Sequence, residues 1–188
     1  MEAIKEKNQI KEETVKEQNK IFNIIEIFFV ASIIGWIYEM IFYKVTENIL
    51  ENRGFLYGPY VPVYGFGAIL IVLLLKRFKK KPLMLFIGMA LVTGILELIV
   101  GELMVAVWHK RWWDYTGLFL NIDGQVCLRS VLSFAVGGLG LIYLIEPYIN
   151  KFNEKVSGKN KKVLCIAIVT TIVIDLILCL IIRHPIIL

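Results

Sequence analysis

Four acidic residues lie inside long apolar runs of this 188-residue chain, where carboxylates are costly to bury. They are Glu39, Glu97, Glu102 and Asp175. A charged side chain at the centre of a bilayer costs at least about 2.5–3.5 kcal/mol, so such acids turn toward a cavity or a partner inside the protein. A carboxylate in a cavity can bind a polar ligand or act as a general acid or base. The sequence therefore predicts a polar interior within a mostly apolar protein.

The usual motifs of hydrolases, zinc enzymes and nucleotide-binding proteins are absent from the sequence. It contains no GxSxG, HExxH or Walker motif, so we assign no catalytic residue and no nucleotide site. His109 is far along the chain from His184, which argues against a zinc site. The cysteines at 127, 165 and 179 form no CxxC pair and suit small apolar positions in helices. We expect no metal and no cofactor, and any ATPase must be a separate chain.

The composition is that of a membrane protein. Hydrophobic residues make up 57% of the chain and the mean hydropathy is +0.69, both above the usual values for soluble domains. The net charge of +5 is spread over short clusters between apolar runs and does not form one basic face. Such clusters set the topology of membrane proteins, so we expect the lipid bilayer of the cell membrane as a partner and no nucleic acid.

Five apolar runs are candidates for membrane-spanning helices, which need about 20 residues each. We therefore predict an all-α, multi-pass helical bundle: residues 1–21 form a polar cytoplasmic arm and residues 22–188 a single transmembrane domain. The predicted spans are Phe22–Tyr43, Pro62–Leu75, Leu83–Trp108, Leu128–Ile149 and Val163–Ile182. Because the second run is short, we expect it to begin earlier, within Gly58–Pro62, or to be partly re-entrant.

The basic clusters also predict the orientation. Lysine and arginine gather in the N-terminal arm, in the connection at 76–81 and in the connection at 151–162, all on one side of a five-span protein. The positive-inside rule places this side in the cytoplasm. The N-terminus is then cytoplasmic and the C-terminus external.

The spacing of small residues indicates which way two of the acids face. Small residues at helical spacing let neighbouring helices approach closely, and they share a helix face with Glu39 and with Glu97. These residues are Ala31 and Gly35 in the first span, and Ala90, Gly94 and Gly101 in the third. Glu102 is rotated by about 140° from Glu97 and faces another neighbour or the outer interface. An alternative is that the acids are structural and pair with Arg129, Arg53 or a tyrosine.

Two other acids, Glu26 and Glu146, lie at the cytoplasmic ends of their spans. We interpret them as ordinary interface residues.

The two predicted outer connections add aromatic and polar groups near the acids. The first contains Arg53, Tyr57 and Tyr64 among glycines and prolines, and the alternative to a site there is an aromatic belt at the interface. The second mixes aromatic surface with polar groups. Its candidates are Trp113, Asp114, Asn121 and Arg129.

Several stretches of these segments resemble a bacterial membrane family known as Putative ABC-transporter type IV, or CmpB-like. They are RGFLYGP at 53–59, PVYGFG at 62–67, ELIVGE at 97–102, WDY at 113–115, and the segment from Asn121 through Gly124 to CLRS at 127–130. The resemblance covers roughly residues 22–150 and implies a transport-type protein from a Gram-positive bacterium. It also implies that most of the candidates form one site: Glu39, Arg53, Glu97, Glu102, Trp113, Asp114, Asn121 and Arg129.

The predicted function is a permease-like or solute-binding transport subunit with an outward-facing polar cavity. Its energy would come from partner chains, such as a separate ATPase or another membrane subunit, and a homo-oligomer is a further option. The predicted ligand-binding residues are Glu39, Arg53, Tyr57, Tyr64, Glu97, Glu102, Trp113, Asp114, Asn121 and Arg129. Two alternatives stay open: a membrane enzyme that acts on a lipid or lipid-linked substrate at the outer leaflet, and a non-transporting sensor or assembly protein.

Overall fold

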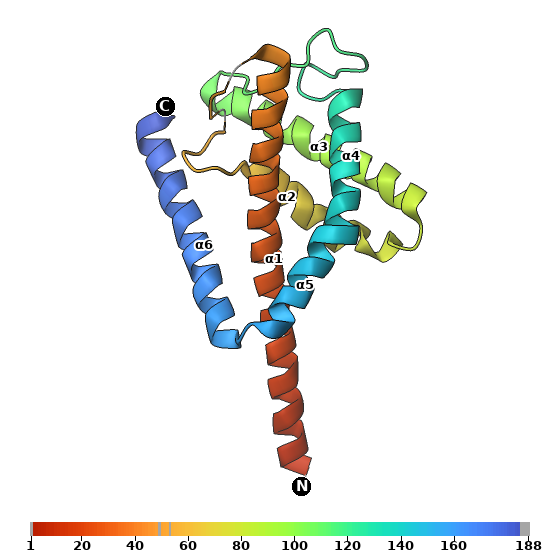
Figure 1. Ribbon diagram of the computed structural model, residues 1–188, viewed down its shortest axis with the longest axis vertical. Helices are drawn as coiled ribbons and strands as arrows, with labels where there is room; N and C mark the ends of the chain where they lie inside the picture. The colour runs from red at the N-terminus through yellow and green to blue at the C-terminus, as the bar shows by residue number, and fades with distance from the viewer. Residues whose placement is uncertain (1, 49, 53, 185–188) are drawn as a thin grey trace.

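The computed structural model describes residues 2–48, 50–52 and 54–184, and these residues form a helical bundle (Figure 1). Its α-helices are α1 (Glu2–Glu47), α2 (Pro62–Leu70), α3 (Pro82–Trp108), α4 (Leu128–Gly140), α5 (Glu146–Lys155) and α6 (Gly158–Leu178). Short π-helical and 3-10 segments continue three of them: η1 (Ile71–Leu75), η2 (Lys76–Phe78), η3 (Leu141–Ile145) and η4 (Cys179–Arg183). Within the described ranges there is no β-strand, and the all-α prediction is confirmed.

Among the described residues, four helical segments are long and apolar enough to cross a bilayer, so the protein is a membrane protein. They are Glu13–Glu47, Pro82–Trp108, Leu128–Lys155 and Gly158–Arg183, which correspond to the first, third, fourth and fifth predicted spans. The second predicted span falls short. It begins at Pro62 and ends at Phe78, and at about 1.5 Å per residue its roughly 25 Å do not cover a hydrocarbon core of about 30 Å.

The helices differ in direction (Figure 1). Helices α1, α6 and the continuous α4–α5 segment run roughly along the long axis of the molecule, and the α2–α3 hairpin crosses them obliquely. Helix α1 contacts α2, α5 and α6, and α3 contacts α4. The N- and C-termini lie at opposite ends, and the predicted polar arm is the first part of α1, projecting from the bundle.

Close contacts at small residues explain how these helices pack. A Cβ atom added to Gly35 of α1 would lie 2.2 Å from the ring of Tyr64, so α2 can approach α1 only because residue 35 is glycine. A Cβ atom on Gly94 of α3 would lie 2.8 Å from a methyl group of Val131 in α4. The faces that carry Glu39 and Glu97 therefore contact other helices, as the spacing predicts.

The connection between α1 and α2 is held as a loop by Asp175 and Arg183 of the last helical segment. The carboxylate of Asp175 accepts hydrogen bonds from the backbone amides of Tyr57 (3.0 Å) and Gly58 (2.8 Å) and from the Tyr60 hydroxyl (2.5 Å). The guanidinium of Arg183 donates to the carbonyl oxygens of Asn52, Gly54, Phe55 and Leu56. Because these contacts fix the segment as a loop, the second helix begins at Pro62 and not earlier.

A polar network lies at the end of the bundle nearer the N-terminus. Glu26 and Glu146, expected to be ordinary interface residues, are 6% and 3% exposed. Three asparagines link them, and Lys76 donates to Glu146. The contacts run from Glu26 through Asn153, Asn23 and Asn150 to Glu146 and Lys76. Both acids are therefore buried among asparagine amides and a lysine, and they are not exposed at the ends of their helices.

Candidate ligand-binding site

A cavity of about 230 Å³ lies where α1, α2, α3, α4 and the 109–127 loop meet. Five of the ten predicted ligand-binding residues line it: Glu39, Tyr64, Glu97, Trp113 and Arg129. They come from four helices and the loop, so tertiary packing brings them together. Most of the remaining lining is apolar or aromatic, as is usual for small-molecule sites.

Glu97 is the most enclosed acid of the cavity, with 4% of its surface exposed. Its Oε1 accepts a hydrogen bond of 2.9 Å from the Tyr115 hydroxyl, and its Oε2 accepts one of 2.6 Å from the Ser130 hydroxyl. Both donors lie outside α3, one in the 109–127 loop and one at the start of α4. The carboxylate therefore has a fixed position, and each oxygen keeps a lone pair for a ligand.

Local structure at the start of α4 positions Ser130. Cys127 is the N-cap residue, and its side chain accepts a hydrogen bond of 3.5 Å from the backbone amide of Ser130. The Ser130 hydroxyl accepts in return from the backbone amide of Cys127, at 3.1 Å. This reciprocal capping box holds the hydroxyl next to Glu97 and also stabilises the first turn of α4.

Glu39 lies in the same cavity as Glu97, and the two carboxylates are close enough to interact electrostatically. Glu39 also interacts with Tyr64, whose ring lies 4.9 Å from the ring of Phe134 between centroids. Two acids thus face one aromatic-walled space.

Arg129 supplies the positive group of the cavity. Its guanidinium lies 4.9 Å from the centroid of the Phe42 ring and 5.8 Å from that of Tyr115. No ion pair joins Arg129 to an acid anywhere in the described residues. The alternative in which Arg129 pairs with an acid is therefore not found there, and aromatic faces hold this cation instead, a contact worth about 0.5–2 kcal/mol. Pairing of an acid with a tyrosine, which the same alternative includes, does occur: Tyr115 donates to Glu97 and Tyr60 donates to Asp175.

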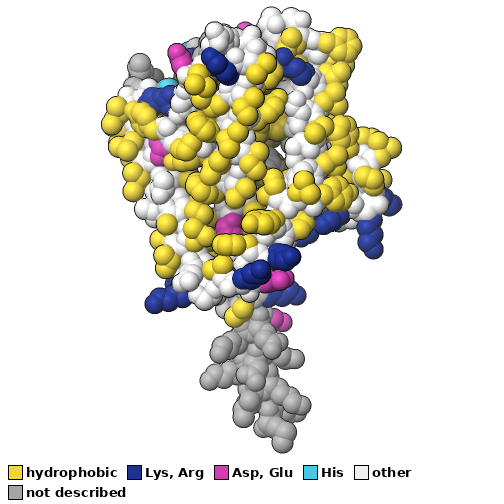
Figure 2. Space-filling model, viewed as in Figure 1, with side chains coloured by type: hydrophobic (Ala, Val, Ile, Leu, Met, Phe, Trp, Pro, Cys, Tyr) yellow, Lys and Arg dark blue, Asp and Glu magenta, His cyan; other side chains and the backbone are white. Residues whose placement is uncertain are grey.

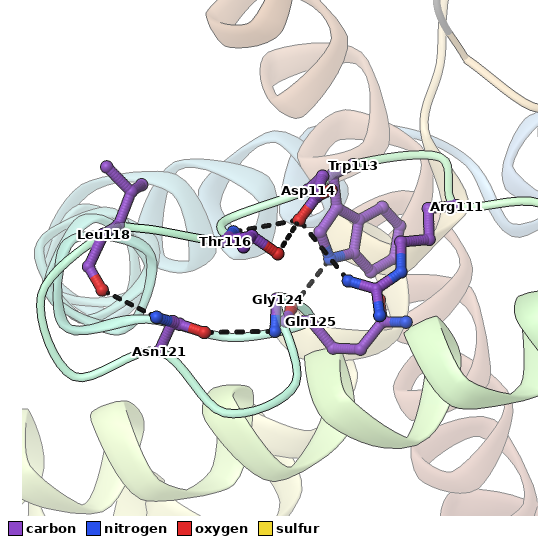
Figure 3. A network of polar contacts seen from close by, with 8 residues as sticks. All are labelled: Arg111, Trp113, Asp114, Thr116, Leu118, Asn121, Gly124 and Gln125. Carbon is purple, nitrogen blue, oxygen red and sulfur yellow. Dashed lines mark hydrogen bonds and ion pairs between the residues drawn. The ribbon is translucent and has the colours of Figure 1, made fainter.

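The 109–127 loop is folded by its own polar contacts (Figure 3). The Trp113 indole donates to the carbonyl oxygen of Gln125 at 2.7 Å, which holds the ring against the cavity. The exposed Asp114 accepts from the hydroxyl (2.6 Å) and the amide (2.9 Å) of Thr116. These two bonds, with Arg111 nearby, lower the pKa of Asp114 below its ordinary value. Asp114 therefore shapes the loop and does not line the cavity.

Asn121 also shapes the 109–127 loop and does not line the cavity. Its amide nitrogen donates to the carbonyl oxygen of Leu118 at 2.9 Å, and its amide oxygen accepts from the backbone amide of Gly124 at 3.2 Å (Figure 3). Gly124 has a φ of +68°, a left-handed conformation that glycine adopts without strain. Asn121 thus closes the turn that returns the chain to α4.

The other predicted site residues lie elsewhere. Glu102 is exposed on α3 and does not line the cavity. Tyr57 belongs to the loop between α1 and α2, where its amide donates to Asp175 and its ring lies 5.2 Å from the Arg183 guanidinium. Arg53 lies outside the described residues.

Sequence reasoning missed two important residues of the site, Tyr115 and Ser130. Both occur in motifs quoted above, yet neither was placed among the ligand-binding residues. Burial and the charge of Glu97 raise the pKa of Tyr115 far above its ordinary value, so this hydroxyl stays a donor. Ser130 is three residues after Cys127, but cysteine is not a usual N-cap residue, so the sequence contains no clear signal of the capping box.

The polar groups of the cavity come from several kinds of side chain. In the part of the chain that the structure describes, no group of three or more His, Cys, Asp or Glu side chains is placed to hold a metal. The cavity instead offers two carboxylates, one guanidinium, hydroxyl groups and aromatic faces.

The arrangement can be compared with known families. The family model described as Putative ABC-transporter type IV (CmpB) matches residues 26–180. The chain belongs to this family. The match includes the last span, beyond the 22–150 segment whose motifs carry the resemblance. No curated protein and no solved structure matches the chain. Membership in the CmpB family and the four apolar helices together identify a membrane protein of transport type.

Proposed function

We propose that this CmpB-family protein is a permease-like or solute-binding subunit of the cell membrane that binds a small polar or amphipathic solute in its 230 Å³ cavity. The observation that carries the proposal is the meeting of Glu39, Glu97 and Arg129 inside one aromatic-walled space. A purely structural role for the acids does not need such a space. One water molecule takes about 30 Å³ of liquid, so the cavity has room for a small solute.

The charges of the cavity favour a cationic or zwitterionic ligand. Two carboxylates and one guanidinium line the cavity, so the lining offers acceptors for a cationic group of a ligand and a donor for an anionic one. The rings of Tyr115 and Trp113 add faces that attract cations. In the zwitterionic case Arg129 meets the negative group of the ligand.

The remaining parts of the proposal concern direction and energy. The cavity lies toward the end of the bundle away from the N-terminus, and the lysine clusters favour a cytoplasmic N-terminus. Together these observations support an outward-facing cavity. The chain carries no nucleotide motif, so a partner chain supplies energy.

A thermal-stability screen of the full chain in detergent tests the proposal. Small amines and zwitterions should raise the melting temperature of the wild type, because a ligand that binds only the folded state stabilises it. Glu97→Gln should remove this response and keep the side-chain volume. Glu102→Gln is the matched control, since it changes an exposed acid of the same helix. A response that persists in Glu97→Gln, or none to any solute in the wild type, would count against a binding cavity.

A further inference from the structure

A second cavity lies between α1, η3–α5 and α6, nearer the N-terminal end of the bundle. It is a groove of about 560 Å³ with apolar walls. Phe29 comes from α1, Tyr148 and Phe152 from α5, and Leu164 from α6. The charged member of this lining is Glu26 of α1. An acid in an apolar groove requires an explanation, because burying an ionised carboxylate is unfavourable unless donors surround it.

The carboxylate of Glu26 is only partly satisfied. It is 6% exposed, and its Oε2 accepts from the side-chain amide of Asn153. Its Oε1 has no hydrogen-bond partner in the described part of the protein, and neither has the amide oxygen of Asn153, which is 4% exposed overall. Two neighbouring side chains therefore each leave one buried acceptor without a donor. Such pairs are rare in folded proteins and indicate a missing partner.

The nearby cations do not fill this role. Lys161 of α6 acts on Glu26 electrostatically, but its ammonium donates to Asn19 at 3.0 Å. Lys76 is paired with Glu146. Cys165, which also faces Glu26, donates to the carbonyl oxygen of Phe22. None of these groups donates a hydrogen bond to Oε1 of Glu26 within the described residues.

The depth of Glu26 places it near a headgroup. It follows Phe22, where the apolar run begins, by one helical turn, or about 6 Å along α1. Leu144 and Tyr148, which line the groove, are 71% and 73% exposed, so the groove opens on the apolar surface. Figure 2 shows that this surface ends in a band of Lys and Arg side chains toward the N-terminal end of the body.

We propose that this groove binds a bilayer lipid whose headgroup ends in a primary ammonium. The ammonium donates one hydrogen bond to Oε1 of Glu26 and one to the amide oxygen of Asn153, and an acyl chain lies along the apolar walls. The phosphate of the same lipid then lies at the level of the lysines. A primary ammonium has three N–H donors, whereas the quaternary ammonium of choline has none, so hydrogen bonding selects between lipids of equal charge and chain length.

The test uses the full-length chain in detergent micelles doped with phosphatidylethanolamine or with phosphatidylcholine of the same acyl chains. Native mass spectrometry measures lipid retention, and thermal unfolding measures stabilisation. We expect roughly tenfold preferential retention of the ethanolamine lipid, with a matching rise in melting temperature, as charge-assisted hydrogen bonds would give. Glu26→Gln should abolish the preference. Glu17→Gln, an exposed acid of the same helix, should keep it, and so should Glu97→Gln in the first cavity.

A second variant, which keeps Glu26, distinguishes loss of the lipid site from a folding defect in Glu26→Gln. Leu164→Trp fills the groove from a side chain that is 40% exposed, and it should also remove the ethanolamine preference. Equal retention of the two lipids by the wild type would overturn the proposal. A preference that survives in both Glu26→Gln and Leu164→Trp would do the same. Stabilisation by sodium ions alone, lost in Glu26→Gln, would show a site for an inorganic cation and would also overturn it.

Discussion

The hydroxyl of Tyr115 donates a 2.9 Å hydrogen bond to Oε1 of Glu97, and this contact attaches the 109–127 loop to α3. The same ring lies beside the guanidinium of Arg129. One tyrosine thus contacts both a negative and the positive group of the first cavity.

Removing this hydroxyl should destabilise the protein, although the aromatic ring still lines the cavity. Tyr115→Phe keeps the ring beside Arg129 but takes one of the two donors from a buried carboxylate. We expect a loss of about 1–3 kcal/mol in the free energy of unfolding. Chemical denaturation in detergent measures it. Tyr148→Phe changes a tyrosine that is 73% exposed and should stay within about 0.5 kcal/mol of the wild type. Equal effects of the two changes would contradict the assigned contact.

The contact between Gly35 and Tyr64 predicts that two glycine-to-alanine variants differ in stability. In Gly35→Ala the new methyl group would lie 2.2 Å from the Tyr64 ring, so α1 and α2 must separate, at a cost of about 1–3 kcal/mol. Gly140→Ala is the control, because nothing lies within 4 Å of its added Cβ atom and alanine favours helix. Thermal unfolding should show a lower melting temperature for the first variant and an unchanged or higher one for the second. A lower melting temperature for Gly140→Ala than for Gly35→Ala would exclude the close approach of α1 to α2.

Asp175 should control the order of the loop between α1 and α2. Asp175→Asn replaces a charged acceptor that receives bonds from two backbone amides and one hydroxyl with a weaker neutral one. Hydrogen exchange at the amides of Tyr57 and Gly58 should become at least about tenfold faster, since each charge-assisted bond contributes about 1.5–3 kcal/mol. Exchange within α3 should not change, and a uniform increase over the whole chain would instead indicate global destabilisation.

Stability should fall in acid partly through Asp114. The pKa of Asp114 is lowered in the folded protein because the hydroxyl and amide of Thr116 donate to its carboxylate. The ionised group therefore stabilises the folded state above the ordinary pKa of 3.8, and this contribution is lost as the pH falls through the lower folded pKa. Melting curves of the wild type and Asp114→Asn should differ near neutral pH and converge well below pH 3.8. A difference in melting temperature that stays the same at every pH would show that it does not come from ionisation of Asp114.

The orientation can be tested by labelling. A cysteine introduced at Phe119, which is 74% exposed in the 109–127 loop, should react with an impermeant reagent in intact cells. A cysteine at Lys155, near the end of α5, should react only after permeabilisation. The three native cysteines are buried and should contribute little background. The opposite pattern would reverse the predicted topology.

Local sequence patterns predicted the site where the relevant information lies within one helix. The spacing of Gly94, Glu97 and Gly101 gave the correct inward face, because helix periodicity alone determines which side chains share a face. The same patterns could not tell whether an aromatic ring or an acid would hold Arg129. That choice depends on how α1, α4 and the 109–127 loop pack.

Long-range contacts account for the parts that were not predicted. The contact between Tyr57 and Asp175 joins residues 118 positions apart, and neither local sequence contains a sign of the other. Hydropathy placed Glu26 and Glu146 at the ends of spans, where acids are commonly exposed. Asparagines from α1 and α5 enclose them instead, and an asparagine near a helix end has no pattern that indicates such a role.

The unbroken helix α1 carries an acid of each cavity. Glu26 and Glu39 are thirteen residues apart, which corresponds to about 20 Å along the axis and about 220° around it. One acid therefore faces the groove beside α5 and α6, and the other faces the cavity beside α2 and α4. Because one continuous helix carries both carboxylates, a shift of α1 along its axis or a rotation about it would displace both together. Occupancy of one cavity can then affect the other through the backbone of α1 alone.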